Sequence, residues 1–277
     1  KTQDMSKLQM SAIVAGAVAM VATSCTVSGS QDKSGVMSRE NVEENVREFV
    51  YPLPTAFEVT EMLNRIEAAY IVDICNPRGN VDKYVTEAKR AQNMGVYSAD
   101  LCYASTYNQQ ANVMEYTQTI RALVDALDMT QAVDPELATK MEDNENNKEG
   151  MTELISNSFY DSYDYLNKHG RGPVSLMIVA GSWVEGLYIA THISDDTFDN
   201  KEMVKILLSQ KEPLEKLIKL LDQNLADANI KTLRTRLQPL NEIYSKTDAN
   251  SITEEIMKSI KDQADAVRSV MVDPGQA

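Results

Sequence analysis

Two acidic residues stand in otherwise apolar stretches of the chain and could supply acid–base chemistry. Glu185 lies in SLMIVAGSWVEGLYIATHI, residues 175–193, and Asp100 lies in GVYSADLCYAS, residues 95–105. Two carboxyl groups in one core, with His192 nearby, could act as the general acid and base of a hydrolase. Each could equally be structural, bonded to a tyrosine hydroxyl or an arginine, because a buried carboxylate is costly unless it is paired. We favour the structural interpretation and predict no catalytic residue.

A histidine and two aspartates have a spacing that could bind a metal ion. His192, Asp195 and Asp196 would present three ligands in one direction if their helix continued that far. The sequence SDDTFDN, residues 194–200, is instead typical of a turn between helices. Asp199, followed three residues later by a glutamate, has the pattern of a helix cap. We therefore predict no metal site and no cofactor.

Aromatic residues gather in the two apolar stretches and could bind a ligand. The chain has 12 tyrosines and a single tryptophan. Tyrosine combines an apolar ring with a polar hydroxyl, which suits contacts with a glycan, a peptide or a protein, although such residues often only bridge core and surface. We predict a groove where the two stretches meet. Its expected ligand-binding residues are Tyr97, Asp100, Tyr103, Trp183, Glu185 and Tyr188.

The same two stretches share a sequence pattern. Residues 95–105 and 181–191, named here the echo segments, both read Gly-x-aromatic-x-x-x-Leu-x-x-Ala followed by Ser or Thr. The pattern is either a true internal repeat or a coincidence in helical composition, where leucine and alanine recur freely. A true repeat predicts two similar helical halves, at about 38–142 and 149–277, that meet around these segments. The polar run DNENNK, residues 143–148, is the expected boundary between them.

Helical periodicity runs through the chain from residue 38 onward. Apolar residues recur every three to four positions, and no alternating run is long enough to predict a strand. Capping boxes open at Thr55 and Ser251, each with a glutamate three residues later. The fold class predicted is all-α, a compact multi-helix bundle of about ten helices. We expect helices near 38–49, 55–69, 80–105, 107–129, a short one from Asp134, then 151–169, 173–192, 200–225 with a break near Pro213, 229–244 and 252–272.

Composition excludes some classes of protein. The chain has 277 residues, of which 43% are hydrophobic and 25% charged, enough for a substantial core. Its net charge of −14 repels phosphate backbones, so we expect no nucleic-acid partner. Cys75 and Cys102 could form one bridge in an oxidising compartment, or remain two buried thiols.

The beginning of the sequence has the pattern of an export signal. Residues 8–22 are mostly apolar, follow Lys7 and lead through small residues to Cys25. This run is too short to span a bilayer comfortably, which takes ~20 apolar residues, but it suits a signal peptide. The stretch VATSC, residues 21–25, resembles the lipobox of bacterial lipoproteins, with Ala22 where leucine is usual. An ordinary signal peptide with a chance cysteine, or a buried N-terminal helix, are the alternatives.

The resemblance to bacterial lipoproteins implies a lipid anchor. Residues 1–24 would be removed as a signal peptide, and Cys25 would carry a diacylglycerol group and an acylated amino group. Two or more acyl chains hold a protein firmly to a membrane. The polar residues 25–37 would form a flexible tether, followed by a helical domain over 38–277. The implied location is a bacterial cell envelope, at the outer membrane, facing the periplasm or the surface.

Together these observations predict a lipid-anchored envelope protein with a non-catalytic helical binding domain. Its expected partners are the membrane, through the lipid on Cys25, and either a protein or a small ligand. The alternative is an envelope hydrolase that uses the buried carboxyl groups of Glu185 and Asp100.

Overall fold

The computed structural model of the chain describes residues 52–65, 67–193 and 200–275. These residues form ten α-helices and three short 3-10 helices, and they contain no strand, which confirms the all-α class. The signal peptide, Cys25, the tether and the first expected helix lie outside the described residues. The α-helices are α2 (Pro52–Arg65), α3 (Glu87–Thr106), α4 (Gln110–Ala126), α5 (Leu137–Asp143), α6 (Lys148–Lys168), α7 (Gly172–His192), α8 (Lys201–Ser209), α9 (Lys211–Gln223), α10 (Ala228–Ser245) and α11 (Glu254–Val272).

Two long helices, α3 and α7, form the centre of the domain and cross at close range. They carry the two echo segments, which meet at Gly95 and Gly181. A Cβ atom on Gly95 would lie 2.9 Å from the carbonyl carbon of Ile178, and one on Gly181 would lie 2.9 Å from the carbonyl carbon of Gln92. Each contacted residue stands three positions before the opposite glycine, so the two contacts are equivalent. Glycine is required here because only a residue without Cβ lets the backbones approach so closely.

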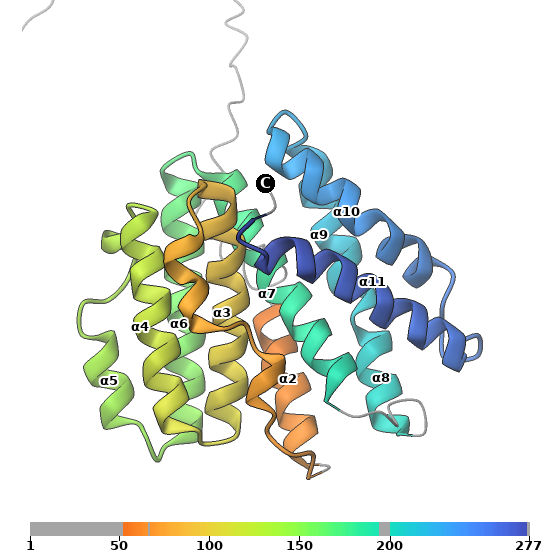
Figure 1. Cartoon of the computed structure of the whole chain (residues 1–277), viewed down its shortest axis with the longest axis horizontal. Coiled ribbons are helices and arrows are strands. Elements are labelled where there is room, and N and C mark those ends of the chain that lie inside the picture. The colour runs from red at the N-terminus through yellow and green to blue at the C-terminus, as the bar shows by residue number, and fades with distance from the viewer. Residues whose placement is uncertain (1–51, 66, 194–199, 276–277) are drawn as a thin grey trace, which may run out of the picture. The chain divides into compact units, whose positions relative to one another are not determined.

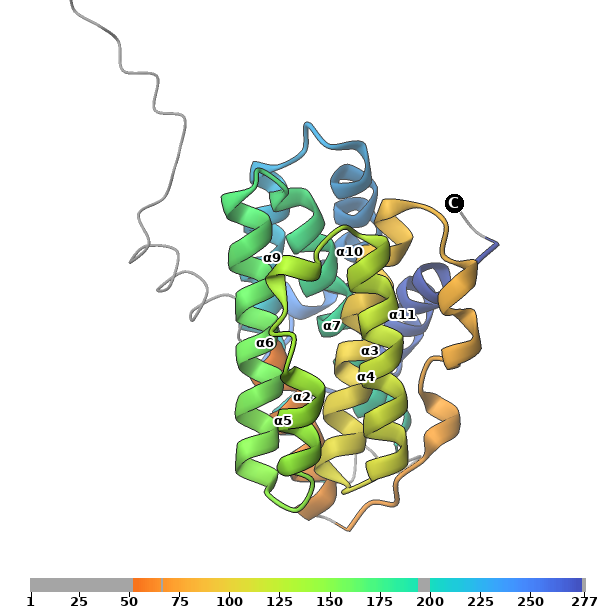
Figure 2. The same cartoon turned by 90° about the vertical axis from the view of Figure 1, so that its left-hand side faces the viewer.

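The other helices flank this central pair on two sides (Figure 1). On one side α4 packs against α3, α6 packs against α3 and α7, and α5 packs against α6. Figure 2 looks onto the face that these three helices form. On the other side α11 packs against α7 and α10, and α10 packs against α9, while α2 contacts both central helices. The buried side chains of all these helices belong to one hydrophobic core, so the two expected halves share it. The polar run 143–148 spans the end of α5, the turn over residues 144–147 and the first residue of α6.

Helix α7 is apolar on every side and is buried almost throughout. It is the one described helix that is long and apolar enough to cross a membrane. However, 94% of its most apolar stretch is buried inside the domain. The surrounding helices therefore supply the apolar environment that its composition demands, and α7 serves as the core helix.

Two helices begin at residues other than the predicted caps. Helix α2 begins at Pro52 rather than at Thr55, because a proline in the first turn lacks an amide that would otherwise need a partner. The predicted cap Asp199 lies outside the described residues. Helix α8 is capped instead by Asn200, whose Oδ1 accepts a hydrogen bond from the amide of Glu202 at 3.0 Å. The predicted break near Pro213 is confirmed, because α8 ends and α9 begins there.

The expected helix over 80–105 and the last helix also begin later than predicted. Residues Arg78–Lys83 form a 3-10 turn, and α3 follows with Thr86 as its cap. Helix α11 is capped by Thr253, whose Oγ1 accepts from the amide of Ile256 at 3.3 Å. Ser251, the predicted cap, instead bonds with Asp248 in the preceding turn. Ser251 and Thr253 both carry a hydroxyl group, so the sequence pattern predicts the cap two residues too early.

The end of α11 is held to α3 by a buried lysine. The ammonium group of Lys89 donates to the carbonyl oxygen of Asp273 at 2.9 Å and also reaches those of Val270 and Met271. Asn93 Nδ2 donates to the carbonyl oxygen of Met271 at 2.9 Å. These donors satisfy carbonyl groups that have no partner inside the helix, and the positive charge suits the helix C-terminus.

Candidate functional site

The most buried charged pair joins α7 to α11. Glu185 is 0% exposed, and Arg268 forms a two-pronged ion pair with it, at 2.6 Å from Nε to Oε2 and 2.7 Å from Nη2 to Oε1. Arg268 Nη2 also donates to the carbonyl oxygen of Ile74 at 3.0 Å. The expectation that Glu185 has a buried partner is confirmed. The parallel donors of a guanidinium group match a carboxylate better than any other side chain could.

Asp100 lies against this pair, and we call Asp100, Glu185 and Arg268 the carboxyl cluster. Asp100 is 0% exposed, and its Oδ2 accepts a hydrogen bond from the amide of Asn76 at 3.1 Å. Burial, and then the neighbouring charge of Glu185, raise the pKa of the Asp100 carboxyl well above its ordinary value of 3.8. Its Oδ1 finds no N–H or O–H donor among the described residues. Both observations favour the uncharged form of this carboxyl group.

The carboxyl cluster reaches towards the surface through a stack of side chains. The Arg268 guanidinium lies 3.9 Å from the centre of the Tyr188 ring, which stacks on His192 with 3.9 Å between ring centres. His192 Nε2 lies 2.9 Å from Asp265 Oδ1. Burial lowers the pKa of His192, and this effect exceeds the opposing effect of Asp265. His192 is thereby engaged with an aspartate of α11, whereas Asp195 and Asp196 lie outside the described residues.

Sequence reasoning missed Arg268, although a signal for it exists. On α11 the buried residues Ile260, Ala264, Val267 and Met271 form the apolar stripe. Arg268 stands four positions after Ala264 and therefore on the edge of that stripe. The most apolar segment of the chain contains an acid, Glu185, which needs a buried partner. An arginine at the edge of an apolar stripe therefore predicts an ion pair between Arg268 and Glu185.

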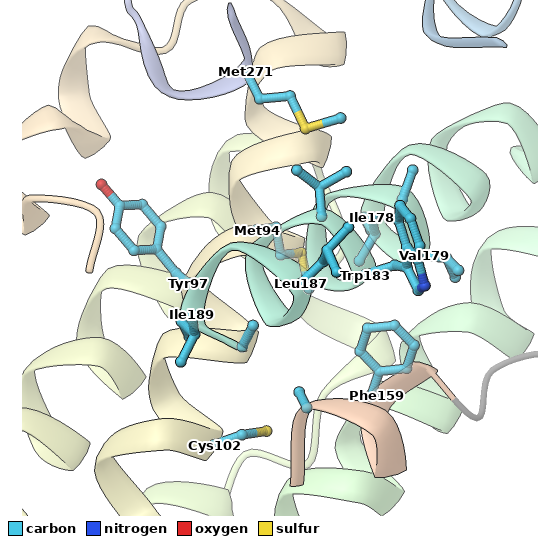
Figure 3. Close-up of a cluster of buried hydrophobic side chains, with 14 of the residues drawn as sticks. Met94, Tyr97, Cys102, Phe159, Ile178, Val179, Trp183, Leu187, Ile189 and Met271 are labelled. Carbon is cyan, nitrogen blue, oxygen red and sulfur yellow. The ribbon is translucent and has the colours of Figure 1, made fainter. Parts of the chain in front are cut away.

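The structure brings some of the predicted binding residues together and separates others. Asp100 and Glu185 meet in the carboxyl cluster, and Tyr188 lies beside it. Tyr97 is 0% exposed and donates to the carbonyl oxygen of Pro77 at 2.9 Å. Figure 3 shows Tyr97 and Trp183 on opposite sides of the hydrophobic cluster, with the Tyr97 hydroxyl pointing away from it.

Three of the predicted aromatic residues are core residues. Tyr97, Tyr103 and Trp183 are each at most 2% exposed. The Tyr103 hydroxyl accepts from the amide of Ile71 at 2.9 Å, and its ring packs 4.7 Å from that of Tyr70. These tyrosines anchor the segment before α3 to the helix face, which matches the bridging role that tyrosine often has.

The two cysteines of the described region are both free and buried. Burial raises the pKa of the Cys75 and Cys102 thiols, and the charge of Asp100 adds to it. Of the two alternatives drawn from the sequence, the structure supports the pair of buried thiols. Both behave as small apolar side chains of the core.

A separate pocket of about 270 Å³ lies between α3, α4, α5 and α6. We call it the α3–α6 pocket; the helices α4, α5 and α6 that wall it face the viewer in Figure 2. Its walls are largely apolar and include Met94, Leu101, Met141, Ile155 and Phe159. It reaches the surface, because some of its lining residues are exposed. None of the six predicted binding residues lines this pocket.

Small polar residues on apolar helix faces create the volume of this pocket. On α6 the buried residues run Ile155, Phe159, Ser162 and Leu166, so a serine interrupts the apolar stripe. Ser98 has the same effect on α3, where it lies next to Met94 one turn earlier. Such serines are the sequence signal that could have located the pocket, because a small side chain in an apolar stripe leaves space that its neighbours do not fill.

The chain matches no known protein family model, no curated protein and no solved structure. The helices and pockets described above are therefore the observations from which a function can be argued.

Proposed function

We propose that the helical domain is a non-catalytic binding module that holds an apolar small molecule in the α3–α6 pocket. The observation that carries this proposal is the pocket, with a volume of about 270 Å³ and walls that are mostly apolar. Water in such a space finds few hydrogen-bond partners, so an apolar molecule of similar size replaces it favourably.

The side chains of the pocket suit a binding role. Met94, Met114 and Met141 all contribute to its lining. Methionine is flexible and polarisable, so it adjusts to ligands of different shape. In the carboxyl cluster, by contrast, both carboxyl groups are fully buried, and Glu185 is paired with Arg268. This supports a structural role for Glu185 and Asp100 better than the acid–base role of a hydrolase, which needs contact with substrate and water.

The test is the binding of a neutral fluorescent apolar probe, N-phenyl-1-naphthylamine, whose emission rises when it leaves water. We expect the wild-type chain to bind it saturably. Ala138→Phe places a ring into the pocket from α5 and should abolish the saturable signal. Ala122→Phe is the matched control, because Ala122 is exposed on α4 and does not line the pocket. Equal binding by both variants, or no binding by the wild type, would refute the proposal.

We also propose that the domain is anchored to a bacterial envelope through lipid on Cys25. The support is the lipobox-like sequence at residues 21–25 and the polar stretch that follows it. Mass spectrometry of the chain, expressed in a Gram-negative host and extracted gently, should show acyl chains on a polypeptide that begins at Cys25. Cys25→Ser should remove that mass. A wild-type chain without acyl groups would contradict the anchor and leave the binding proposal standing.

A further inference from the structure

The charges at the mouth of the α3–α6 pocket are unbalanced. Its lining includes the carboxylates of Asp125, Asp134 and Glu142 against the single guanidinium of Arg121. Lys140 pairs with Asp134 and offsets its charge in part. Counting Lys140, three carboxylates face two cations, and the Asp125 carboxylate belongs to no ion pair among the described residues. The mouth therefore keeps an excess of negative charge.

The hydroxyl groups inside the pocket also favour a ligand that donates hydrogen bonds. Ser98 donates its proton to the carbonyl oxygen of Met94 at 2.7 Å, and Ser162 donates to that of Ser158 at 2.9 Å. Thr117 likewise donates to a carbonyl oxygen of its own helix, at 2.8 Å. A hydroxyl that has used its proton offers only lone pairs to a ligand. These walls therefore accept hydrogen bonds from a ligand.

One carboxylate is placed to meet a ligand at the mouth. Asp125 is exposed near the end of α4, and its Oδ1 accepts from the Thr130 hydroxyl at 3.2 Å. Thr130 also lines the pocket, within the 3-10 turn Thr130–Ala132. Asp134 follows this turn, so two carboxylates flank it. A charged group of a ligand could lie there while its apolar part fills the interior.

We infer that the α3–α6 pocket takes an amphiphilic cation, an apolar molecule that carries a protonated amine. This inference rests on the proposed function, because it assumes that the pocket is the binding site. The apolar walls remove the hydrocarbon part from water. The amine lies at the mouth, where the carboxylates attract it and the lone pairs accept its N–H groups. A carboxylate ligand of the same length meets repulsion and finds few donors.

Competition among three ligands of equal chain length tests the inference. Decylamine, decan-1-ol and decanoate are titrated, at neutral pH and below micelle formation, against the bound N-phenyl-1-naphthylamine. We expect decylamine to displace the probe at a concentration about fivefold lower than decan-1-ol, with decanoate weakest, since one exposed charge pair gives up to about a fivefold effect. The preference should shrink when ionic strength rises from about 0.01 M to about 1 M.

A charge-neutralising variant links the preference to the mouth. Asp125→Asn should weaken decylamine severalfold and leave decan-1-ol unchanged. Asp128→Asn is the matched control. Asp128 lies three residues after Asp125, is also exposed and does not line the pocket, so its substitution removes the same charge outside the site. Equal binding of the three ligands, or preference for decanoate, overturns the charge inference while the binding module stands. Failure of the wild-type chain to bind the probe and all three ligands overturns both.

Discussion

Adding one methyl group at the crossing of α3 and α7 should destabilise the domain strongly. The change is Gly181→Ala, whose Cβ would lie 2.9 Å from the carbonyl carbon of Gln92 and closer still to its oxygen. Ordinary contacts of this kind begin at 3.4 Å. The two helices must therefore move apart by half an ångström or more, because backbone atoms of a buried helix cannot turn aside as a side chain can.

The size of the effect follows from the contacts that this separation weakens. A gap of 0.5–1 Å forfeits about a quarter to a half of the dispersion energy of each contact. If the crossing makes about as many contacts as one buried leucine, 40–60 at ~0.1–0.2 kcal/mol each, the loss is roughly 1–6 kcal/mol. Alanine regains about 1 kcal/mol through its better helix propensity. We expect a net loss of about 3 kcal/mol, a large part of the stability of an ordinary domain.

Urea denaturation, followed by circular dichroism and by the fluorescence of Trp183, measures this loss. Gly186→Ala is the matched control on the same helix, because its Cβ would meet Ala56 at an ordinary 3.6 Å. That variant should be as stable as the wild type or up to about 1 kcal/mol more stable. Similar free energies of unfolding for the two variants would refute the argument from close approach.

The equivalent contact on α3 allows a sharper test. Gly95→Ala should destabilise by a similar amount, because its Cβ would lie 2.9 Å from the carbonyl carbon of Ile178. One separation of the helices relieves both clashes, so the double variant should lose less than the sum of the two single losses. Additive losses would show that the two glycines act at independent sites.

Three further predictions concern the charged groups of the core. Because its pKa is raised, Asp100 keeps a proton in the folded state that the unfolded state releases above about pH 4. The contribution of this group to stability is therefore present at low pH. It falls by ~1.4 kcal/mol per pH unit as the pH rises, until the folded pKa is reached. Asp100→Asn should remove that slope in urea titrations run upward from about pH 4, and equal slopes in both chains would contradict it. Arg268→Met should cost about 3–5 kcal/mol of stability, because it leaves Glu185 buried and unpaired. Adding Glu185→Gln to this variant should recover part of the loss. No recovery in the double variant would argue against the ion pair. Lys89→Met should cost about 1–3 kcal/mol of stability and speed amide hydrogen exchange at the end of α11. The control Lys258→Met, on the exposed side of that helix, should change stability by less than about 0.5 kcal/mol. Equal effects of the two substitutions would exclude the capping role of Lys89.

The sequence was informative about helices because periodicity is a local property. The stripe of α11 and the uniformly apolar α7 both predicted their burial, and the need of Glu185 for a partner followed from the cost of an unpaired charge. Helix starts were less predictable, because Ser251 and Thr253 can both cap and only the tertiary position of the turn selects between them. Such selection depends on contacts that a single segment does not contain.

The pocket and the position of the aromatic residues were harder to predict. The echo segments indicated where two helices meet, and α3 and α7 do meet there, but at their glycines. So close a crossing brings the backbones together and leaves no groove between them for Tyr97 and Trp183 to line. The α3–α6 pocket forms instead beside Ser98 and Ser162, which belong to two helices that are far apart in the sequence. Its volume also depends on how α4, α5 and the 3-10 turn Thr130–Ala132 pack around these serines, and no local sequence pattern predicts that packing.

The ion pair of Arg268 also affects the order in which the chain can fold. Its bond to the carbonyl oxygen of Ile74 joins residues that are 194 positions apart. During synthesis the segment with Glu185 leaves the ribosome long before α11 does, so this acid has no guanidinium partner until the last helix arrives. A chain that lacks α11 must leave the Glu185 carboxyl group hydrated or protonated, since burying an unpaired carboxylate is costly. Closure of the core around Glu185 therefore depends on α11, which lies far along the chain from the segments that it joins.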